Sequence, residues 1–409
     1  MTTTLDPYIQ WTLNPFQQKG LYTPAVEHFD CRLIEEVLKF QQTHPTYTKT
    51  PLHSLTALAR NLQLGAVYVK DESQRFGLNA FKVLGGIYAV AKYIANRLDI
   101  PFENLSFEQL HTAEVKQALG TLTFISATDG NHGRGVAWAA RELGHQSIIY
   151  MPKGSSQQRL QAIRDEGAEA SIRDVNYDEC VRQCADLAEV NGYIMVQDTA
   201  WPGYEEIPLW IMQGYAAMAF EITEQLGEAH LQPPTHIVLQ AGVGSFAGAI
   251  AAYFQQVYVE SPPTIIVVEA DQAACYYKSF TSETGEIQFV DGDMATIMAG
   301  LACGEPNTDA YKILRHYTKA TFACDDAISA MGMRIYGNPL ADDPKIISGE
   351  SGAVTLGLLA YLQRFADSAI AQQLALNAHS RVLVISTEGN TDEAQYENVT
   401  WLGHYPVLK

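Results

Sequence analysis

From residue 121 onward the chain alternates short apolar runs with longer helical segments, and this alternation constrains the fold more than any other feature. Each apolar run is typical of a buried strand. Strands that are joined by helices pair in parallel through right-handed crossovers. The predicted strands span residues 122–127, 147–151, 169–172, 193–196, 236–240, 264–269 and 381–386. The predicted helices include residues 135–143, 157–166, 178–190 and 208–226.

The alternation breaks at Pro202 and Gly203, which divides the pattern into two units. We therefore predict an α/β fold with two open parallel-sheet domains, the smaller inserted in the larger. The predicted small domain spans residues 89–204, and residues 1–88 and 205–409 form the large domain. A chain of 409 residues is long enough to build two such cores.

The composition narrows the class of partner. The formal net charge is −19 and the isoelectric point is about 4.9, so neither nucleic acid nor an anionic membrane is an expected partner. We expect no membrane span and no signal peptide, because no apolar run approaches 18 residues and the N-terminus lacks a basic region. The cysteines are scattered, and Cys180 and Cys184 have no further metal ligands nearby. These features predict a cytoplasmic protein without a metal site, acting on a small molecule.

Lys82 lies among apolar and small residues in the stretch GLNAFKVLGG (77–86). A lone lysine in such a helix most often snorkels to the surface. A buried ammonium instead finds a partner, loses its charge or reacts. Gly85 and Gly86 lie on the same face, where they either leave room beside the lysine or allow close helix packing.

A glycine-rich loop, AGVGSFAG (241–248), follows the predicted strand 236–240 and precedes a helix. Backbone N–H groups and the positive end of the helix favour an anion in such a loop. Glu269 ends the next strand, where an acid could bind the ribose of a dinucleotide. The spacing G-x-G-x-x-x-G is one residue longer than the dinucleotide fingerprint. Phosphate binding, dinucleotide binding and a plain tight turn all remain open at this point.

Three further turns place polar groups at the ends of elements. The turn SATDGNHGRG (126–135) offers Asp129 and Asn131, which are also good helix caps. The turn STEGNTD (386–392) places hydroxyls at a strand end, where a plain turn is the commoner explanation. The stretch SGESGA (348–353) begins a helix with Glu350 in its first turn, and the helix dipole alone accounts for that acid. Several polar groups at the carboxyl ends of apolar strands nevertheless indicate a binding site.

Together these segments resemble the pyridoxal-phosphate enzymes of the tryptophan synthase β-subunit-like family (fold type II), which includes threonine dehydratase, cysteine synthase and serine racemase. The matching pieces are NAFKVLGG, ATDGNHG, GVGSFAG, SGESGA and STEGN, and they occur in the family's order over most of the chain. The resemblance implies the family's two-domain fold, pyridoxal 5'-phosphate as the cofactor, and a homodimer.

The resemblance also implies roles for the matching residues. Lys82 would carry the cofactor covalently, and Asn131 would bond to its ring hydroxyl. Thr387 would face the pyridine nitrogen, with Ser386 as the alternative, while Glu350 and residues 299–301 would line the ring. The phosphate would be cradled by Gly242, Val243, Gly244 and Ser245. The substrate carboxylate would be held by Thr128, Asp129, Gly130, Asn131 and His132.

Asp129 stands where loops of this family commonly carry a serine, and segments 197–208 and 296–307 resemble one branch of the family. Enzymes of that branch are carbon–nitrogen lyases, which split 2,3-diaminopropionate into pyruvate and two ammonia. The resemblance implies that Asp129 and Asp198 are the bases for the D- and L-isomers respectively. An acid also attracts the second ammonium of a diamino acid, whereas a serine lacks that electrostatic preference.

Other functions compete with this interpretation. The nearest alternative is a serine/threonine dehydratase of the same family. Asp129 counts against it, because loops of this family commonly carry a serine at that position. An NAD-dependent oxidoreductase would use the glycine loop and Glu269, and a non-enzymatic regulator would bind an amino acid without releasing ammonia. Without the resemblance, Asp129 would be a helix cap and Asp198 a loop acid. Cys275 and Cys303 lie in segments near the expected site, and free thiols are favoured there over a disulfide.

Overall fold

The computed structural model describes residues 6–18, 20 and 27–408. Residues 1–5, on which part of the signal-peptide expectation rests, lie outside this range. Among the described residues, no helix combines the length and the apolar character needed to cross a membrane. The six cysteines are free thiols, so Cys275 and Cys303 are not joined by a disulfide.

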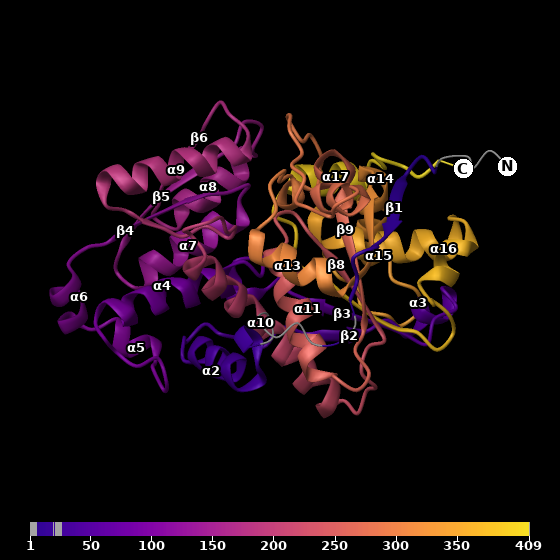
Figure 1. Ribbon diagram of the computed structural model, residues 1–409, viewed down its shortest axis with the longest axis horizontal. Coiled ribbons are helices and arrows are strands. Elements are labelled where there is room, and N and C mark those ends of the chain that lie inside the picture. Colours follow the sequence, from indigo (N-terminus) through magenta and orange to yellow (C-terminus); the bar gives the residue numbers. More distant parts are fainter. Residues whose placement is uncertain (1–5, 19, 21–26, 409) are drawn as a thin grey trace.

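The strands form two sheets (Figure 1). The four-stranded sheet has the order β6-β5-β4-β7, and every neighbouring pair in it is parallel. Its strands are β4 (Thr123–Ala127), β5 (Gln146–Met151), β6 (Glu169–Ile172) and β7 (Ile194–Met195). The seven-stranded sheet has the order β1-β10-β9-β8-β11-β3-β2. Its strands are β1 (Ile9–Leu13), β2 (Leu52–Ser54), β3 (Ala66–Asp71), β8 (His236–Gln240), β9 (Thr264–Ala270), β10 (Thr318–Cys324) and β11 (Arg381–Ser386).

The larger sheet is mixed, because its two edge strands run against the five central ones. β1 pairs antiparallel with β10, and β2 pairs antiparallel with β3. The central strands β10, β9, β8, β11 and β3 pair in parallel. The predicted α/β fold is confirmed, and the antiparallel edges are the feature that the sequence did not indicate. β1 and β2 are short and partly exposed, so neither carries the continuous apolar run of a buried strand.

Helices connect and cover both sheets. The helices up to the end of the four-stranded sheet are α2 (Cys31–Gln42), α3 (Thr56–Asn61), α4 (Val83–Arg97), α5 (Phe107–Leu110), α6 (Ala113–Leu119), α7 (Asn131–Glu142), α8 (Gln157–Asp165) and α9 (Tyr177–Asn191). The later helices are α10 (Glu206–Glu228), α11 (Ser245–Val257), α12 (Cys275–Thr281), α13 (Thr308–Tyr317), α14 (Asp326–Gly337), α15 (Glu350–Arg364), α16 (Ser368–Gln373) and α17 (Glu393–Thr400). Short 3-10 turns lie at Glu27–Phe29, Arg75–Gly77, Asp271–Ala273 and Ala299–Leu301.

Glycines let α4 pack closely against two other helices. A Cβ atom on Gly214 of α10 would lie 2.4 Å from the Leu84 carbonyl oxygen of α4. A Cβ atom on Gly86 would lie 3.0 Å from the Gly135 carbonyl carbon of α7. The glycines that follow Lys82 therefore serve close helix packing, which fixes the start of α4 between helices of both parts of the molecule.

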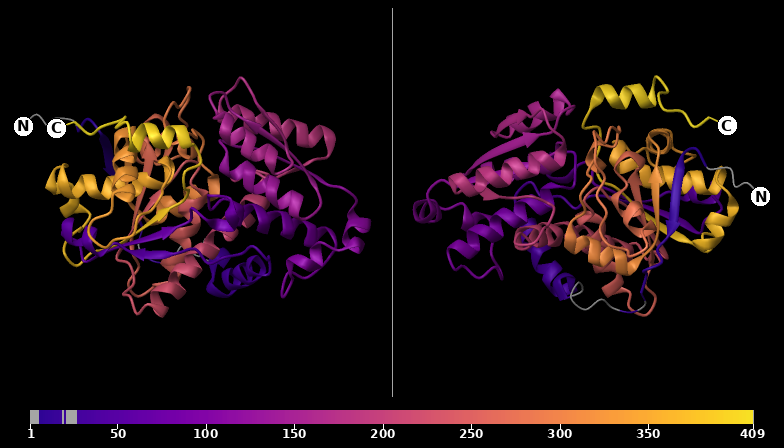
Figure 2. Two further views of the ribbon diagram at one scale, coloured as in Figure 1. Left: turned by 180° about the vertical axis from the view of Figure 1, so that it is seen from behind. Right: turned by 45° about the horizontal axis from the view of Figure 1, so that its top comes forward.

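The part with the four-stranded sheet lies beside the part with the seven-stranded sheet in all three views (Figures 1 and 2). Helix α10 leads from the first part to the second. Helix α4 runs across residue 88, where the sequence placed the boundary between domains. The division into residues 1–88, 89–204 and 205–409 stays a prediction.

Candidate active site

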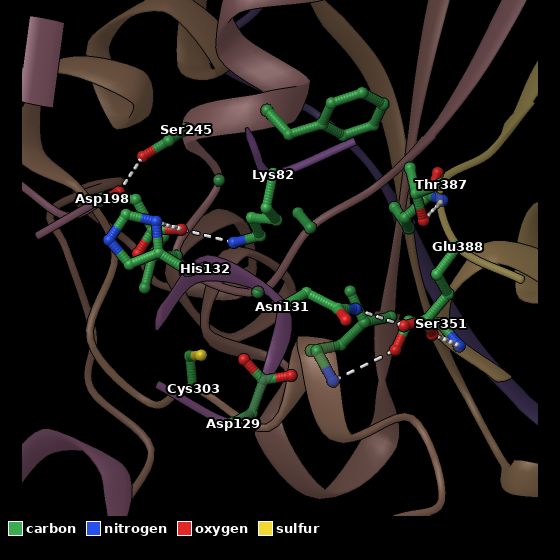
Figure 3. Close-up of a pocket in the computed structure, with 18 of the residues that line it drawn as sticks. Lys82, Asp129, Asn131, His132, Asp198, Ser245, Cys303, Ser351, Thr387 and Glu388 are labelled. Carbon is green, nitrogen blue, oxygen red and sulfur yellow. Dashed lines mark hydrogen bonds and ion pairs between the residues drawn. The ribbon is translucent and has the colours of Figure 1, made fainter. Parts of the chain in front are cut away.

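The segments that follow β4, β8 and β11 line one cavity, together with the start of α4 and the segment after β7 (Figure 3). Polar groups at the carboxyl ends of parallel strands converge in this way in open α/β sheets. The cavity brings together most of the residues singled out in the sequence. These are Lys82, Asp129, Asn131, His132, Asp198, Gly242, Val243, Gly244, Ser245 and Thr387, with Gly300 and Leu301 of the predicted ring-lining segment.

Lys82 points into this cavity and does not snorkel to the surface. Its side chain is 16% exposed, and its Nζ donates a hydrogen bond to Asp198 Oδ2. Burial acts to lower the pKa of Lys82, but Asp198, Tyr215 and Asp129 together outweigh it and hold the pKa above its usual value. The rings of Phe81 and Tyr215 lie 5.8 and 6.0 Å from Nζ. The amine is thus confined, charged and paired with one carboxylate.

Asp198 is buried in a network of polar side chains. The hydroxyl of Tyr177 donates to its Oδ1 at 3.4 Å, and that of Tyr215 donates to its Oδ2 at 3.5 Å. The Nδ1 atom of His132 lies 3.9 Å from Oδ2. Burial opposes ionisation of Asp198, but the His132 ring and the Lys82 ammonium outweigh it and hold the pKa of Asp198 below its usual range. Asp198 is therefore an ionised group beside Lys82 and not a solvated loop acid.

Asp129 presents a carboxylate oxygen to the cavity. Its Oδ2 is buried and makes no hydrogen bond with any described residue. Burial raises the pKa of Asp129, and the charges of Lys82 and Arg159 act against that rise. Asp129 does not cap α7: Gly130 is the N-cap residue, and the side chain that accepts a hydrogen bond from the Gly133 N–H in the first turn is that of Thr128. A buried acceptor without a partner is costly unless a ligand supplies the donor.

The loop between β8 and α11 forms a cradle of backbone N–H groups. No side chain in the described part of the chain caps the N-terminus of α11, so its first N–H groups are free for an anion. Gly244 has a φ of +94°, and a Cβ atom there would lie 1.9 Å from the Tyr276 hydroxyl. A Cβ atom on Gly242 would lie 3.1 Å from the Gly300 carbonyl oxygen across the cavity. The loop therefore requires glycine at position 244 and leaves little room for a side chain at position 242, and its donors fit the phosphate of pyridoxal phosphate.

The turn after β11 supplies a hydroxyl. Thr387 Oγ1 accepts a hydrogen bond from Gln240 Nε2 at 2.9 Å, which leaves the hydroxyl hydrogen of Thr387 available. Ser386 is fully buried and bonds to the Ser348 hydroxyl at 2.9 Å, and it does not line the cavity. Of the two hydroxyls considered for the pyridine nitrogen, only that of Thr387 faces the cavity.

Glu388 is a cavity residue that the sequence analysis missed. Its Oε2 accepts a hydrogen bond from Asn131 Nδ2, and its Oε1 accepts one from the Ser351 N–H at the start of α15 (Figure 3). Glu388 therefore ties the loop after β4 to the start of α15. Its position next to Thr387 at the end of a predicted strand was the available signal. Ser351 and Tyr177 also line the cavity without having been predicted, and so does Cys303, which the sequence placed only in a segment near the expected site.

Besides Ala299, three predicted site residues lie beside the cavity rather than in it. Glu350 lines a neighbouring cleft and pairs with Arg159 at 3.5 Å. Thr128 is buried, and its Oγ1 accepts hydrogen bonds from the N–H groups of Gly130 and Gly133 at 2.9 and 3.0 Å. Gly130 packs under the side chain of Arg159. The roles predicted for these three residues stay predictions.

Both carboxylate oxygens of Glu269 are occupied by backbone groups and are not available to a ligand. Its two carboxylate oxygens accept hydrogen bonds from the N–H groups of Tyr276 and Tyr277, both at 2.7 Å. These N–H groups lie in the first turn of α12, so Glu269 caps that helix. The acid that a ribose would need is therefore occupied, which takes away the main support for a dinucleotide site.

The chain is similar to known proteins over most of its length. A family model described as "Pyridoxal-phosphate dependent enzyme" matches residues 43–388. The diaminopropionate ammonia-lyase of Salmonella typhimurium is 51% identical over 97% of this chain and 98% of its own length. The chain belongs to the diaminopropionate ammonia-lyase family of pyridoxal-phosphate dependent enzymes. The predicted family and cofactor are thereby confirmed.

Solved structures of the diaminopropionate ammonia-lyase family have the same fold. The holo enzyme of Escherichia coli superposes with a TM-score of 0.90 at 45% identity, over 98% of both chains. The same enzyme in complex with an aminoacrylate-PLP azomethine reaction intermediate superposes with a TM-score of 0.89 at 45% identity, over 98% of both chains. As a member of this family, the chain is a carbon–nitrogen lyase that acts by α,β-elimination.

Proposed function

We propose that the protein removes both amino groups of 2,3-diaminopropionate, accepts the D- and L-isomers, and releases pyruvate and two ammonia. One observation carries this proposal: two acids from different loops, Asp129 and Asp198, line the same cavity as Lys82. The two isomers present their α-proton on opposite faces of the cofactor ring, so one base does not easily serve both. The names of the relatives, which specify diaminopropionate and ammonia, support the choice of substrate.

The residues around the cavity fit pyridoxal phosphate. When bound, this cofactor supplies an electron sink that makes the α-proton of the substrate more acidic. Lys82 Nζ would attach it, the free N–H groups at the start of α11 would hold its phosphate, and Asn131 would bond to its ring hydroxyl. Thr387 would donate its free hydroxyl hydrogen to the ring nitrogen without transferring a full proton. Such a moderate electron sink suits elimination better than transamination.

Two carboxylates and one amine would move the protons. We assign removal of the α-proton to Asp129 for the D-isomer and to Asp198 for the L-isomer. The free Oδ2 of Asp129 is a suitable acceptor, and Asp198 is held ionised. The β-amine leaves readily only when it is protonated, and Lys82 Nζ or the newly protonated acid can supply that proton.

The approach to the cavity favours a substrate with a second ammonium. A neighbouring cleft of about 640 Å³ shares Asp129 and Tyr177 with the cavity. Its charged lining residues are Asp129, Asp174, Asp293, Glu350 and Asp392, against Lys153 and Arg159. This excess of acids attracts a diamino acid more strongly than a monoamino acid.

Comparing substrates tests the proposal against the rival serine/threonine dehydratase. We expect kcat/KM for both diaminopropionate isomers to exceed that for D-serine and L-threonine by about 10²-fold or more, because a buried acid left without its partner is costly. Coupled assays of the 2-oxo acid product measure this ratio. In the matched variant Asp129→Ser, the preference for D-diaminopropionate over D-serine should narrow. Equal or faster turnover of serine or threonine by the unmodified protein would favour the dehydratase.

We also propose that the protein works in the cytoplasm as a homodimer. The six free thiols support a reducing compartment. Large apolar side chains are exposed near the C-terminus, where Trp401 is 77% and Leu402 69% exposed, and burial against a second copy would remove them from water.

A further inference from the structure

Arg159 links the two parts of the molecule beside the active site. It lies in the first turn of α8, is only 7% exposed, and belongs to the part with the four-stranded sheet. Its guanidinium Nη2 lies 3.5 Å from Glu350 Oε2 and donates a hydrogen bond to Thr391 Oγ1 at 3.2 Å. Glu350 begins α15 and Thr391 follows β11, both in the other part. A buried guanidinium is tolerated only when such partners compensate its charge.

The stem of Arg159 supports the loop that carries Asp129. Gly130 has a φ of +152°, and a Cβ atom there would lie 3.0 Å from Arg159 Cδ. Gly130 sits between Asp129 and Asn131, whose side chains both line the cavity. The loop thus packs against the side chain of Arg159 at Gly130, which has no side chain of its own.

Arg159 also lines the same cleft as Asp129, where its positive charge favours the ionised form of that carboxyl group. The groups that act on Asp129 are Lys82 and Arg159, which favour its ionised form, and Glu388 and Asp198, which oppose it. Tyr177, Tyr215 and Cys303 lie in the field of the same carboxylate. Lys82 changes its bonding during the proposed reaction, whereas Arg159 does not. Arg159 is therefore the lasting counter-charge for this acid.

We propose that Arg159 is a positioning residue for the Asp129 loop. It holds the loop in place through its contacts with Glu350 and Thr391, and its positive charge stabilises the Asp129 carboxylate that would remove the proton from the D-isomer. The second part of this inference rests on the proposed function, because Asp129 is there the base for that isomer.

The variant Arg159→Gln tests the charge through the pH dependence of kcat/KM. Loss of the cation raises the pKa of Asp129, so the acid limb for D-diaminopropionate should move up by about one pH unit. The acid limb for the L-isomer should stay in place, because Arg159 acts on Asp129 and is not among the charges that act on Asp198. Arg159→Lys keeps the charge and should restore much of the original profile. Equal shifts for both isomers, or no shift for either, would overturn the assignment.

Hydrogen–deuterium exchange of the cofactor-free protein tests the positioning role without relying on activity. Amides of residues 128–135 should exchange faster in Arg159→Gln than in the unmodified protein. Thr391→Val removes only one contact of the guanidinium and should give a smaller change, which keeps the test usable if Arg159→Gln does not fold. Unchanged exchange in both variants would refute the positioning role. If the protein does not turn over the D-isomer, the proposed function is refuted. The exchange experiment still decides whether Arg159 positions the loop, because it does not depend on activity.

Discussion

Lys82→Ala is expected to abolish the visible absorption band of the purified protein and to stop pyruvate release. Among the described residues, Lys82 is the only lysine that lines the cavity, and it would provide both the covalent attachment and a proton for the leaving amine. Activity should fall by at least the roughly 10²- to 10⁴-fold that a positioned proton-transfer group contributes. Absorbance spectra with added pyridoxal phosphate and single-turnover assays measure the two effects.

The matched control is Lys82→Arg. An arginine keeps a cation beside the buried Asp198 but does not form the attachment, so this variant separates charge pairing from covalent chemistry. We expect Lys82→Arg to unfold at a higher temperature than Lys82→Ala, because Asp198 keeps a partner. The band should be missing in both variants. A full band or undiminished activity in either would show that Lys82 is not the point of attachment.

The second large effect is that replacing either acid should lower kcat/KM for one isomer of diaminopropionate much more than for the other. Asp129→Asn should lower kcat/KM for D-diaminopropionate by roughly 10²- to 10⁴-fold and affect the L-isomer much less. Asp198→Asn should do the reverse. The amide preserves the size of each side chain but accepts no proton, so the comparison isolates the base. Steady-state assays of both variants with both isomers provide the measurement.

Each variant serves as the control for the other, since both remove one carboxylate from the same cavity. Asp198→Asn also removes the counter-charge of Lys82, so its effect on the L-isomer should be read from variants that retain the visible band. Turnover of the D-isomer by Asp129→Asn at the unmodified rate would contradict the assignment of Asp129. Equal losses on both isomers would indicate that the acids act on a common step.

The apolar strands of the sequence predicted much of the fold. Strands β6, β8 and β11 have the predicted bounds; β8 and β11 are buried apolar runs, whereas β6 is a half-exposed edge strand. β1, β2, β3 and β10 were missed. β3 carries Lys70, which is buried and paired with Glu221 of α10 at 2.6 Å. A partner 151 residues away cannot be recognised from the residues around Lys70.

The candidate site was predictable to the extent that local motifs define it. The glycine loop, Lys82 and Asp129 could be located because each lies in a short characteristic stretch. The contacts of Glu388 and Arg159 depend on how the two parts of the molecule face each other, and no local pattern encodes them. The resemblance to a known family, rather than periodicity, gave Asp129 and Asp198 their proposed roles.

The most direct test of the central claim is the ratio of ammonia to pyruvate released from each isomer of 2,3-diaminopropionate. Elimination of the β-amine followed by hydrolysis of the remaining amine predicts two ammonia for every pyruvate with both isomers. A ratio of one ammonia to one pyruvate, or ammonia release without pyruvate, would contradict the account.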